Sequence, residues 1–280
     1  MLTACRGLSP GDLDAIADLE RRVVQVDGGR LKLEWGTLAA RDGQQVDDLL
    51  WWEGGQLLGF LGLYSFGPSL ELAGMVEPAA RRRGIATALL DAALGLARDR
   101  GQPQALLIVP RAAQAGRALA LARGGLLEHS EHALVLVGQP AGGAGDPALA
   151  LRPAVMADAP HVQALLEAGF GRPAPFVAPT LAAGPDRTLL IERDGAPVAT
   201  VRLTRRGTDG GVYGFVVHPH WQGRGIGRDV LRRVCQLLYE QGVRRIGLEV
   251  AVDNERALGL YTSVGFTPVT TEDYYALPTR

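Results

Sequence analysis

The sequence has 280 residues, of which 47% are hydrophobic and 21% charged, a composition that suits a globular protein large enough for two domains. Its formal net charge of −1 gives no electrostatic reason to expect a nucleic acid or a membrane as partner. The two cysteines, Cys5 and Cys235, form no CxxC pair, and no apolar run resembles a leader or reaches membrane-spanning length. We therefore expect a cytoplasmic protein.

An internal repeat divides the sequence near its middle. The stretch GQPAGGAGDPA, at 138–148, is the richest in Gly, Ala and Pro, and we interpret residues 140–148 as a linker. Glycines on its two sides recur at offsets of 140 or 141 residues: Gly55, Gly84, Gly101 and Gly125 correspond to Gly195, Gly225, Gly242 and Gly265. This spacing predicts two copies of one fold, in domains at 1–139 and 149–280.

The second copy reads as a mixed α/β sequence. In chain order we predict a strand at 149–152, a helix at 157–168, strands at 188–192, 198–203 and 212–217, a helix at 225–240, a strand at 246–250, a helix at 255–264 and a strand near 273–277. In the helix at 225–240, apolar residues from Ile226 to Leu237 recur at helical spacing, which predicts one buried face.

The turn between the strand at 212–217 and the helix at 225–240 is rich in glycine. Residues 215–228 read FVVHPHWQGRGIGR, which lacks both the G-x-G-x-x-G spacing of a dinucleotide site and the Gly-Lys-Ser/Thr of a P-loop. Gln222, Arg224 and Arg228 surround the glycines, and free amides at a helix start attract anions. The combination predicts a pyrophosphate site.

Two separate motifs then resemble one family. The Q-x-x-G-x-G turn at 222–227 and NERALGLYTSVGF at 254–266 are similar to the signature of the GNAT superfamily of acyl-CoA-dependent N-acyltransferases. The resemblance covers essentially the whole second copy, and RRRGIA at 81–86 matches it in the first. It implies an α/β fold class (an α+β mixed sheet) with two tandem GNAT-like domains. Each domain would have a mostly antiparallel sheet with a splayed central strand and flanking helices, and acetyl-CoA would be the co-substrate.

The resemblance also implies site residues in the second copy. The implied catalytic residues are Val217, whose amide would face the thioester oxygen, Tyr261, which would protonate the leaving thiolate, and Glu249, which would take a proton from the amine through water. The implied CoA-binding residues are Phe215, Val216, Val217, Gln222, Gly223, Arg224, Gly225, Ile226, Gly227, Arg228 and Asn254.

The first copy keeps the turn but not the tyrosine, because Leu121 stands where the second copy has Tyr261. Its implied CoA-binding residues are Met75, Val76, Arg81, Arg82, Arg83, Gly84, Ile85 and Ala86. Two interpretations stay open: the first copy binds acyl-CoA without turnover, or it is a structural partner. This layout resembles the tandem mycothiol synthase type within the family.

The favoured function is an acetyl-CoA-dependent N-acetyltransferase with a small-molecule amine, rather than a protein, as acceptor. The alternatives are a protein N-terminal or lysine acetyltransferase and a non-catalytic, acyl-CoA-binding regulatory protein. His218 and His220 lack an accompanying cluster of cysteines or carboxylates, so we expect no metal site. The acceptor, the general base and the oligomeric state stay open.

Overall fold

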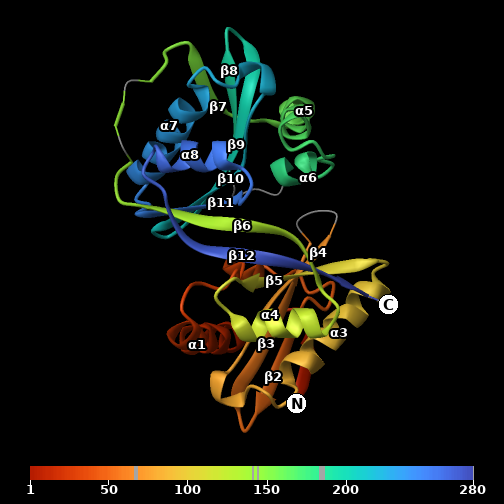
Figure 1. Ribbon diagram of the computed structural model, residues 1–280. Helices are drawn as coiled ribbons and strands as arrows, with labels where there is room; N and C mark the ends of the chain where they lie inside the picture. The colour runs from red at the N-terminus through yellow and green to blue at the C-terminus, as the bar shows by residue number, and fades with distance from the viewer. Residues whose placement is uncertain (66–68, 141, 144, 183–186, 280) are drawn as a thin grey trace. The chain divides into compact units, whose positions relative to one another are not determined.

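The computed structural model describes residues 1–65, 69–140, 142–143, 145–182 and 187–279 (Figure 1). Its internal contacts divide the chain into two compact units. Unit 1 contains Met1–Glu131 and Thr270–Arg280, and unit 2 contains His132–Val269. In the part of the chain that the structure describes, no helix is both long and apolar enough to cross a membrane.

Unit 1 is built on a mixed sheet with the strand order β1-β2-β3-β4-β5-β12. These strands are β1 (Leu2–Cys5), β2 (Asp48–Glu53), β3 (Gln56–Tyr64), β4 (Leu70–Val76), β5 (Gln104–Pro110) and β12 (Thr267–Pro278). The helices are α1 (Pro10–Asp27), α2 (Trp35–Ala39), α3 (Ile85–Asp99) and α4 (Gln114–Ala122), with a 3-10 turn, η1 (Pro78–Ala80). Among the described residues of these strands, β4 and β5 pair in parallel, and the other paired neighbours are antiparallel.

The two faces of this sheet carry different helices. Ile16 and Leu19 of α1 pack with Phe60 of β3 on one face. Leu89 of α3 packs with Leu61 of β3 on the other. Because Phe60 and Leu61 are neighbours in one strand, their side chains point to opposite faces, which places the sheet between α1 and α3.

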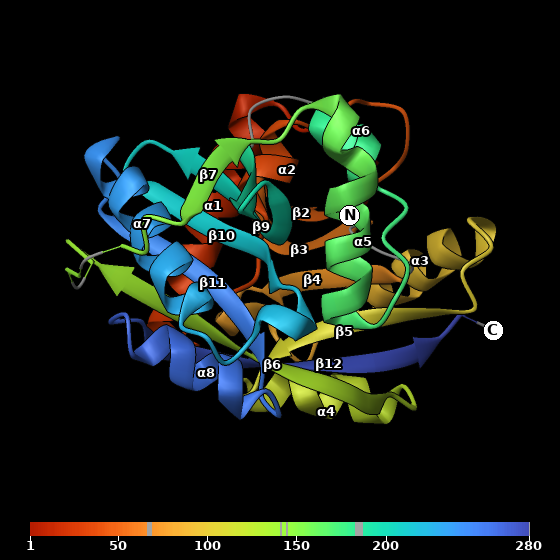
Figure 2. The same ribbon diagram turned by 90° about the horizontal axis from the view of Figure 1, so that it is seen from above.

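Unit 2 repeats this plan with the order β6-β11-β10-β9-β8-β7. Its strands are β6 (Leu126–Val137), β7 (Leu149–Pro153), β8 (Arg187–Arg193), β9 (Ala196–Arg206), β10 (Asp209–Val217) and β11 (Arg245–Ala251). Its helices are α5 (Ala159–Phe170), α6 (Val177–Ala182), α7 (Ile226–Glu240) and α8 (Glu255–Thr262), with 3-10 turns η2 (Met156–Asp158) and η3 (Pro219–Trp221). Figure 2 shows α5 and α7 on opposite sides of strands β8–β10.

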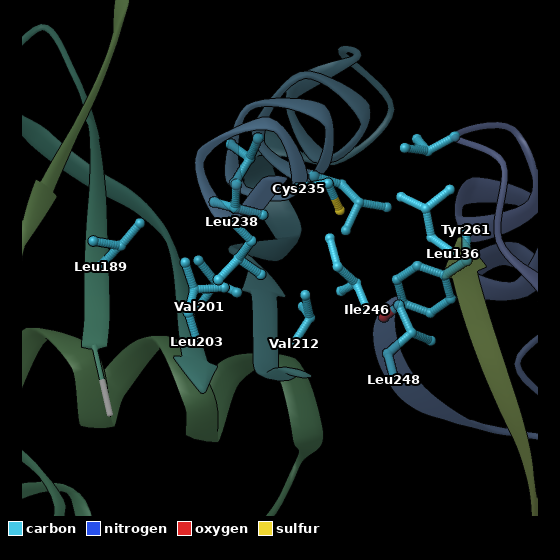
Figure 3. Close-up of a cluster of buried hydrophobic side chains, with 14 of the residues drawn as sticks. Leu136, Leu189, Val201, Leu203, Val212, Cys235, Leu238, Ile246, Leu248 and Tyr261 are labelled. Carbon is cyan, nitrogen blue, oxygen red and sulfur yellow. The ribbon is translucent and has the colours of Figure 1, made fainter. Parts of the chain in front are cut away.

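The predicted apolar face of α7 forms the centre of unit 2. Ile226, Val230 and Val234 are each at most 2% exposed and pack with strands β8–β11. Figure 3 shows Cys235 and Leu238 of the same helix facing these strands, so Cys235 is a core residue. Burying a side chain of this size stabilises a fold by about 1.5–3 kcal/mol, so this face accounts for much of the attachment of α7.

The last strand of each copy belongs in part to the other unit. Residues 272–278 of β12 pair with β5 of unit 1, from Glu272 opposite Pro110 to Pro278 opposite Gln104. Residues 132–137 of β6 belong to unit 2, where Leu134 and Leu136 join the core. The predicted domains, 1–139 and 149–280, follow chain order. By contacts, however, the end of β6 belongs to unit 2 and the end of β12 belongs to unit 1. The periodicity of a strand shows that it pairs but not with which partner, because pairing is non-local.

The central parallel pair opens in both units. Among the described residues, β10 pairs with β11 only at Asp209–Gly211, although β10 continues to Val217. In the same way, β4 pairs with β5 at Leu70–Leu72 and continues to Val76. The splayed central strand that the sequence predicts is therefore present in each copy.

Candidate functional site

The end of β10 directs a backbone amide toward the edge from which β11 has diverged. The His218 N–H donates to Val198 O on β9 at 2.9 Å. Since neighbouring N–H groups of a strand point to opposite edges, the Val217 N–H points away from β9. The Val217 carbonyl at that edge accepts a hydrogen bond from Gln222 Nε2 at 2.9 Å. Gln222 thus ties the turn to the strand end whose amide the sequence predicts as oxyanion donor.

A bulge in β10 sets which side chains flank this amide. The register with β9 shifts between Tyr213 and Val216, and Gly214 has a φ of 53°. After the bulge, Val216 faces α5, because a Cβ at Gly169 would lie 2.3 Å from its side chain. Phe215 and Val217 pack instead against the core under α7. The three strand residues implied to bind CoA are therefore divided between the two faces of the sheet.

The turn before α7 presents exposed backbone amides. Gly223 and Gly225 have φ values of 76° and 81°, a left-handed conformation that side-chain-bearing residues rarely adopt. Gly225 is the N-cap of α7 and makes no side-chain capping bond, so the first amides of the helix point into solvent. Such a helix start is suited to an anion. Ile226 is 2% exposed and anchors the helix in the core.

Gly227 has a different reason to be glycine. A Cβ at this position would lie 3.2 Å from a methyl group of Leu260, so Gly227 allows α7 and α8 to pack closely. The family resemblance implies that all three glycines bind CoA. The geometry shows the left-handed backbone at Gly223 and Gly225 and helix packing at Gly227.

Three arginines surround the turn, and each contacts a neutral group. Arg228 Nε donates to Ser263 Oγ at 3.1 Å, and Arg256 donates to Gln222 Oε1 at 3.1 Å. The Arg224 guanidinium lies 4.8 Å from the centre of the Trp221 ring. Because no carboxylate offsets their charge in these contacts, the rim of the turn is cationic. Sequence reasoning missed Arg256 and Trp221, although Trp221 immediately precedes the motif.

Tyr261 lies on α8 in the unit 2 core. It is 8% exposed, its ring makes an edge contact with Phe266 at 6.2 Å, and Figure 3 shows it beside Leu136 and Leu248. Burial raises the pKa of the Tyr261 phenol to about 12. Like an ordinary phenol, it is protonated at neutral pH, as a general acid must be before it acts.

Asn254 and Glu249 flank this helix. The Asn254 side chain accepts a hydrogen bond from the Ala257 amide at 3.0 Å and so caps α8. On β11, Leu248 and Val250 point into the core under α7. Glu249, which lies between them, therefore points to the opposite face of the sheet from Tyr261.

The first copy has the same turn backbone but different side-chain partners. Arg82 has a φ of 63° and Gly84 one of 83°, close to Gly223 and Gly225. Arg81 Nε donates to Val76 O at 3.3 Å, as Gln222 does to Val217. Arg81 also pairs with Asp27 at 2.7 Å, and Arg83 pairs with Glu53 at 2.7 Å.

The remaining predicted residues of this copy divide between core and surface. Met75 and Ile85 are buried, 6% and 2% exposed. Val76 is half-buried against the core under α3. Leu121, at the position of Tyr261, is 54% exposed. The first copy thus keeps the turn without a group that could act as acid at this position.

The two histidines of the turn contact one another. His218 Nδ1 accepts a hydrogen bond from the His220 amide at 3.3 Å, and the two rings meet edge to face. Within the described ranges, no three His, Cys, Asp or Glu side chains gather closely enough to hold a metal ion.

Comparisons with known proteins also divide the chain into two copies. The model of the acetyltransferase (GNAT) family matches residues 17–124 and again residues 160–266. A mycothiol acetyltransferase of Beutenbergia cavernae is 40% identical over 86 residues, which span 30% of this chain and 29% of that protein.

Two solved structures match along the whole chain. A GCN5-related N-acetyltransferase from Sphaerobacter thermophilus has a TM-score of 0.82 and covers 100% of this chain and 96% of its own. A tandem GNAT protein from the clavulanic acid biosynthesis pathway has a TM-score of 0.71 and covers 100% and 98%. Each is 20% identical to this chain, so these likenesses show the fold alone.

Proposed function

The chain belongs to the acetyltransferase (GNAT) family, and from this premise we propose that its second copy is an N-acetyltransferase acting on a small-molecule amine. Acetyl-CoA is the acyl donor of this family. The observation that carries the proposal is the strand end at Val217, where an amide directed to the open edge adjoins an exposed anion-binding turn. Both features are needed to hold a thioester whose other end carries phosphates.

In the proposed reaction the acceptor amine attacks the thioester carbonyl directly. The Val217 N–H donates a hydrogen bond to the developing oxyanion, a type of contact whose loss costs about 100- to 1000-fold in rate. The amides from Gln222 to Arg228 hold the pyrophosphate. Val217 and Gln222 are already joined by a hydrogen bond, so the two subsites keep a fixed spacing.

Two side chains handle protons. Tyr261, whose phenol is protonated at neutral pH, protonates the departing thiolate. Glu249, on the other face of β11, accepts the proton that the attacking amine loses, through water. These two roles balance the reaction: one proton leaves the amine and one joins the thiol.

The acceptor is proposed to be small because of the tandem layout. The curated relative with the 86-residue match is a mycothiol acetyltransferase, and its name indicates a small-molecule acceptor. We assign the first copy a non-catalytic role because Leu121 replaces the tyrosine.

A panel of amines and peptides, assayed by thiol release from acetyl-CoA, tests the proposal. We expect turnover with a small amine and a loss of about 100-fold in kcat for Tyr261→Phe. Tyr239→Phe, at the end of α7 beside Arg244, is the matched control and should keep full activity. Full activity of Tyr261→Phe at neutral pH would remove the general acid from the mechanism, and turnover of peptides alone would favour a protein acetyltransferase.

A further inference from the structure

One position, equivalent in the two copies, carries opposite charges. Glu53 ends β2 and Arg193 ends β8, and each is followed by a two-residue hairpin turn. The turn residues have matching left-handed φ values: 55° and 80° at Gly54 and Gly55, 52° and 77° at Asp194 and Gly195. The pairing agrees, since Glu53 lies opposite Gln56 and Arg193 opposite Ala196. Glu53 and Arg193 are thus structural counterparts.

In the first copy the residue at this position, Glu53, offsets the charge of an arginine in the turn. The Glu53 carboxylate accepts a hydrogen bond from Arg83 of the turn at 2.7 Å. Hydrogen bonds from Trp51 and Arg83 lower the pKa of Glu53, so it stays ionised at neutral pH. Arg83 therefore presents little net charge to an incoming anion.

In the second copy the same position faces a tryptophan. Arg193 lies 5.8 Å from the centre of the Trp221 ring, and Arg224, the counterpart of Arg83, lies 4.8 Å from it. The aromatic face attracts each guanidinium without neutralising it. Arg193 also pairs with Asp146 at 3.2 Å, whereas no described carboxylate lies within ion-pair distance of Arg224. At the position of Trp221 the first copy has Ala80, which has no ring.

We propose that Arg193, acting through Trp221, positions Arg224 for the phosphate groups of the acyl donor, and that Glu53 withdraws the equivalent cation from the first copy. Arg224 lies between Gly223 and Gly225, in the exposed part of the turn. Its guanidinium is thus placed beside the amides that bind pyrophosphate. A carboxylate at 193 would reach Arg224 as Glu53 reaches Arg83. Arg193 is then a positioning residue that selects phosphate-bearing donors, and this role rests on the proposed function of the turn.

The test measures CoA binding by calorimetry, which needs no knowledge of the acceptor. We expect Arg193→Glu to weaken CoA binding at the second turn by about 10-fold. Arg193→Lys, which keeps the charge, should stay within about threefold of the unchanged protein. The matched control is Arg206→Glu, an equal charge reversal at the end of β9 that is far from the hairpin turn after Arg193.

Three further measurements separate positioning from a structural effect. Arg193→Glu should raise the KM for acetyl-CoA and leave kcat unchanged. It should leave the KM for S-acetylpantetheine, which has no phosphate, unchanged. The dependence of CoA affinity on salt should become shallower, because one cation no longer meets the phosphates.

Each outcome decides a different claim. Unchanged CoA affinity in Arg193→Glu, or an equal rise in KM for S-acetylpantetheine, would overturn the role of Arg193 and leave the proposed function intact. If the unchanged protein binds no CoA, the proposed function of the turn fails, and the role of Arg193 fails with it.

Discussion

The two turns of this protein share a backbone and differ in chemistry. Both begin at a strand end whose carbonyl is held by the next motif side chain, Arg81 in one and Gln222 in the other. In the first copy, however, the arginines of the turn pair with Asp27 and Glu53, whereas in the second they contact neutral groups. A few left-handed positions are enough to maintain the turn, but its charge depends on residues elsewhere in the chain.

The strands before the turns differ as well. β4 pairs with β3 in unbroken register from Val76 to Glu71, whereas β10 shifts against β9. Gly74 occupies the position of Gly214, yet a Cβ at Gly74 would lie 2.5 Å from Phe60 O. The same residue type thus allows close strand contact in one copy and a bulge in the other. The bulge is therefore a structural difference between β10 and β4.

The largest expected effect concerns the exchanged strands. Leu277 lies in the second copy of the sequence but in the unit 1 core, where it is 0% exposed. Leu277→Ala should destabilise unit 1 by about 2–5 kcal/mol. Hydrogen exchange should then show faster exchange in α3 than in α7. Val269→Ala, at a side chain 46% exposed, is the control. Loss of protection in α7 alone would contradict the assignment of this strand end to unit 1.

Alkaline pH should act on the second copy through Tyr261. Burial raises its pKa from 10.0 to about 12, so its contribution is complete below pH 10 and is lost as the pH rises toward 12. The amount is about 3 kcal/mol for two pKa units. In chemical unfolding, Tyr261→Phe should therefore lose less stability than the unchanged protein between pH 10 and 12. Equal losses in both proteins would show that the phenol is not buried as described.

A third change tests whether charge alone separates the turns. Glu53→Gln removes the carboxylate that pairs with Arg83 and should strengthen CoA binding at the first turn about threefold, the size expected of an exposed ion pair. The measurement is calorimetry in a protein whose second turn is disabled by Gly225→Val. Asp18→Asn, which frees Arg21 on α1, is the control for a changed net charge. No gain at the first turn would show that its backbone, rather than Glu53, limits binding.

A further prediction concerns backbone strain. Arg82 holds a φ of 63° without being glycine, which costs about 1 kcal/mol or more. Arg82→Gly should raise the free energy of unfolding by about that amount, and the mirror change Gly223→Arg should lower it. A loss of stability in Arg82→Gly would mean that the side chain contributes more than its backbone costs.

Local patterns predicted most of the fold. The repeat and the nine predicted elements of the second copy are present, because each depends on local periodicity or on glycine positions. The splayed strand, also present, was implied by the family resemblance and not by a local pattern. α6 (Val177–Ala182) was missed, since six residues containing a proline show no helical stripe. The strand near 273–277 begins earlier, at Thr267. The strand exchange was beyond reach because it depends on pairing between distant segments.

The residues of the candidate site also differ in whether a local pattern could reveal them. The residues of the turn form one contiguous motif, so the sequence alone shows that they lie together; their role in binding stays a prediction. Asn254, predicted near the pantetheine, caps α8, a local role that the spacing to Ala257 could have indicated. Arg193 could not be found by motif, since 27 residues separate it from Trp221; only its alignment with Glu53 in the repeat pointed to it.

The exchange of strand ends has a consequence for how such a chain can evolve. After a gene duplication, a copy released from catalysis is ordinarily free to drift or to be deleted. Here β6 carries Leu134 and Leu136 from the first half of the gene into the core around Tyr261. Deleting the first half of the sequence would remove the end of β6 that belongs to unit 2. Unit 2 therefore depends on a strand end that the first half of the sequence supplies.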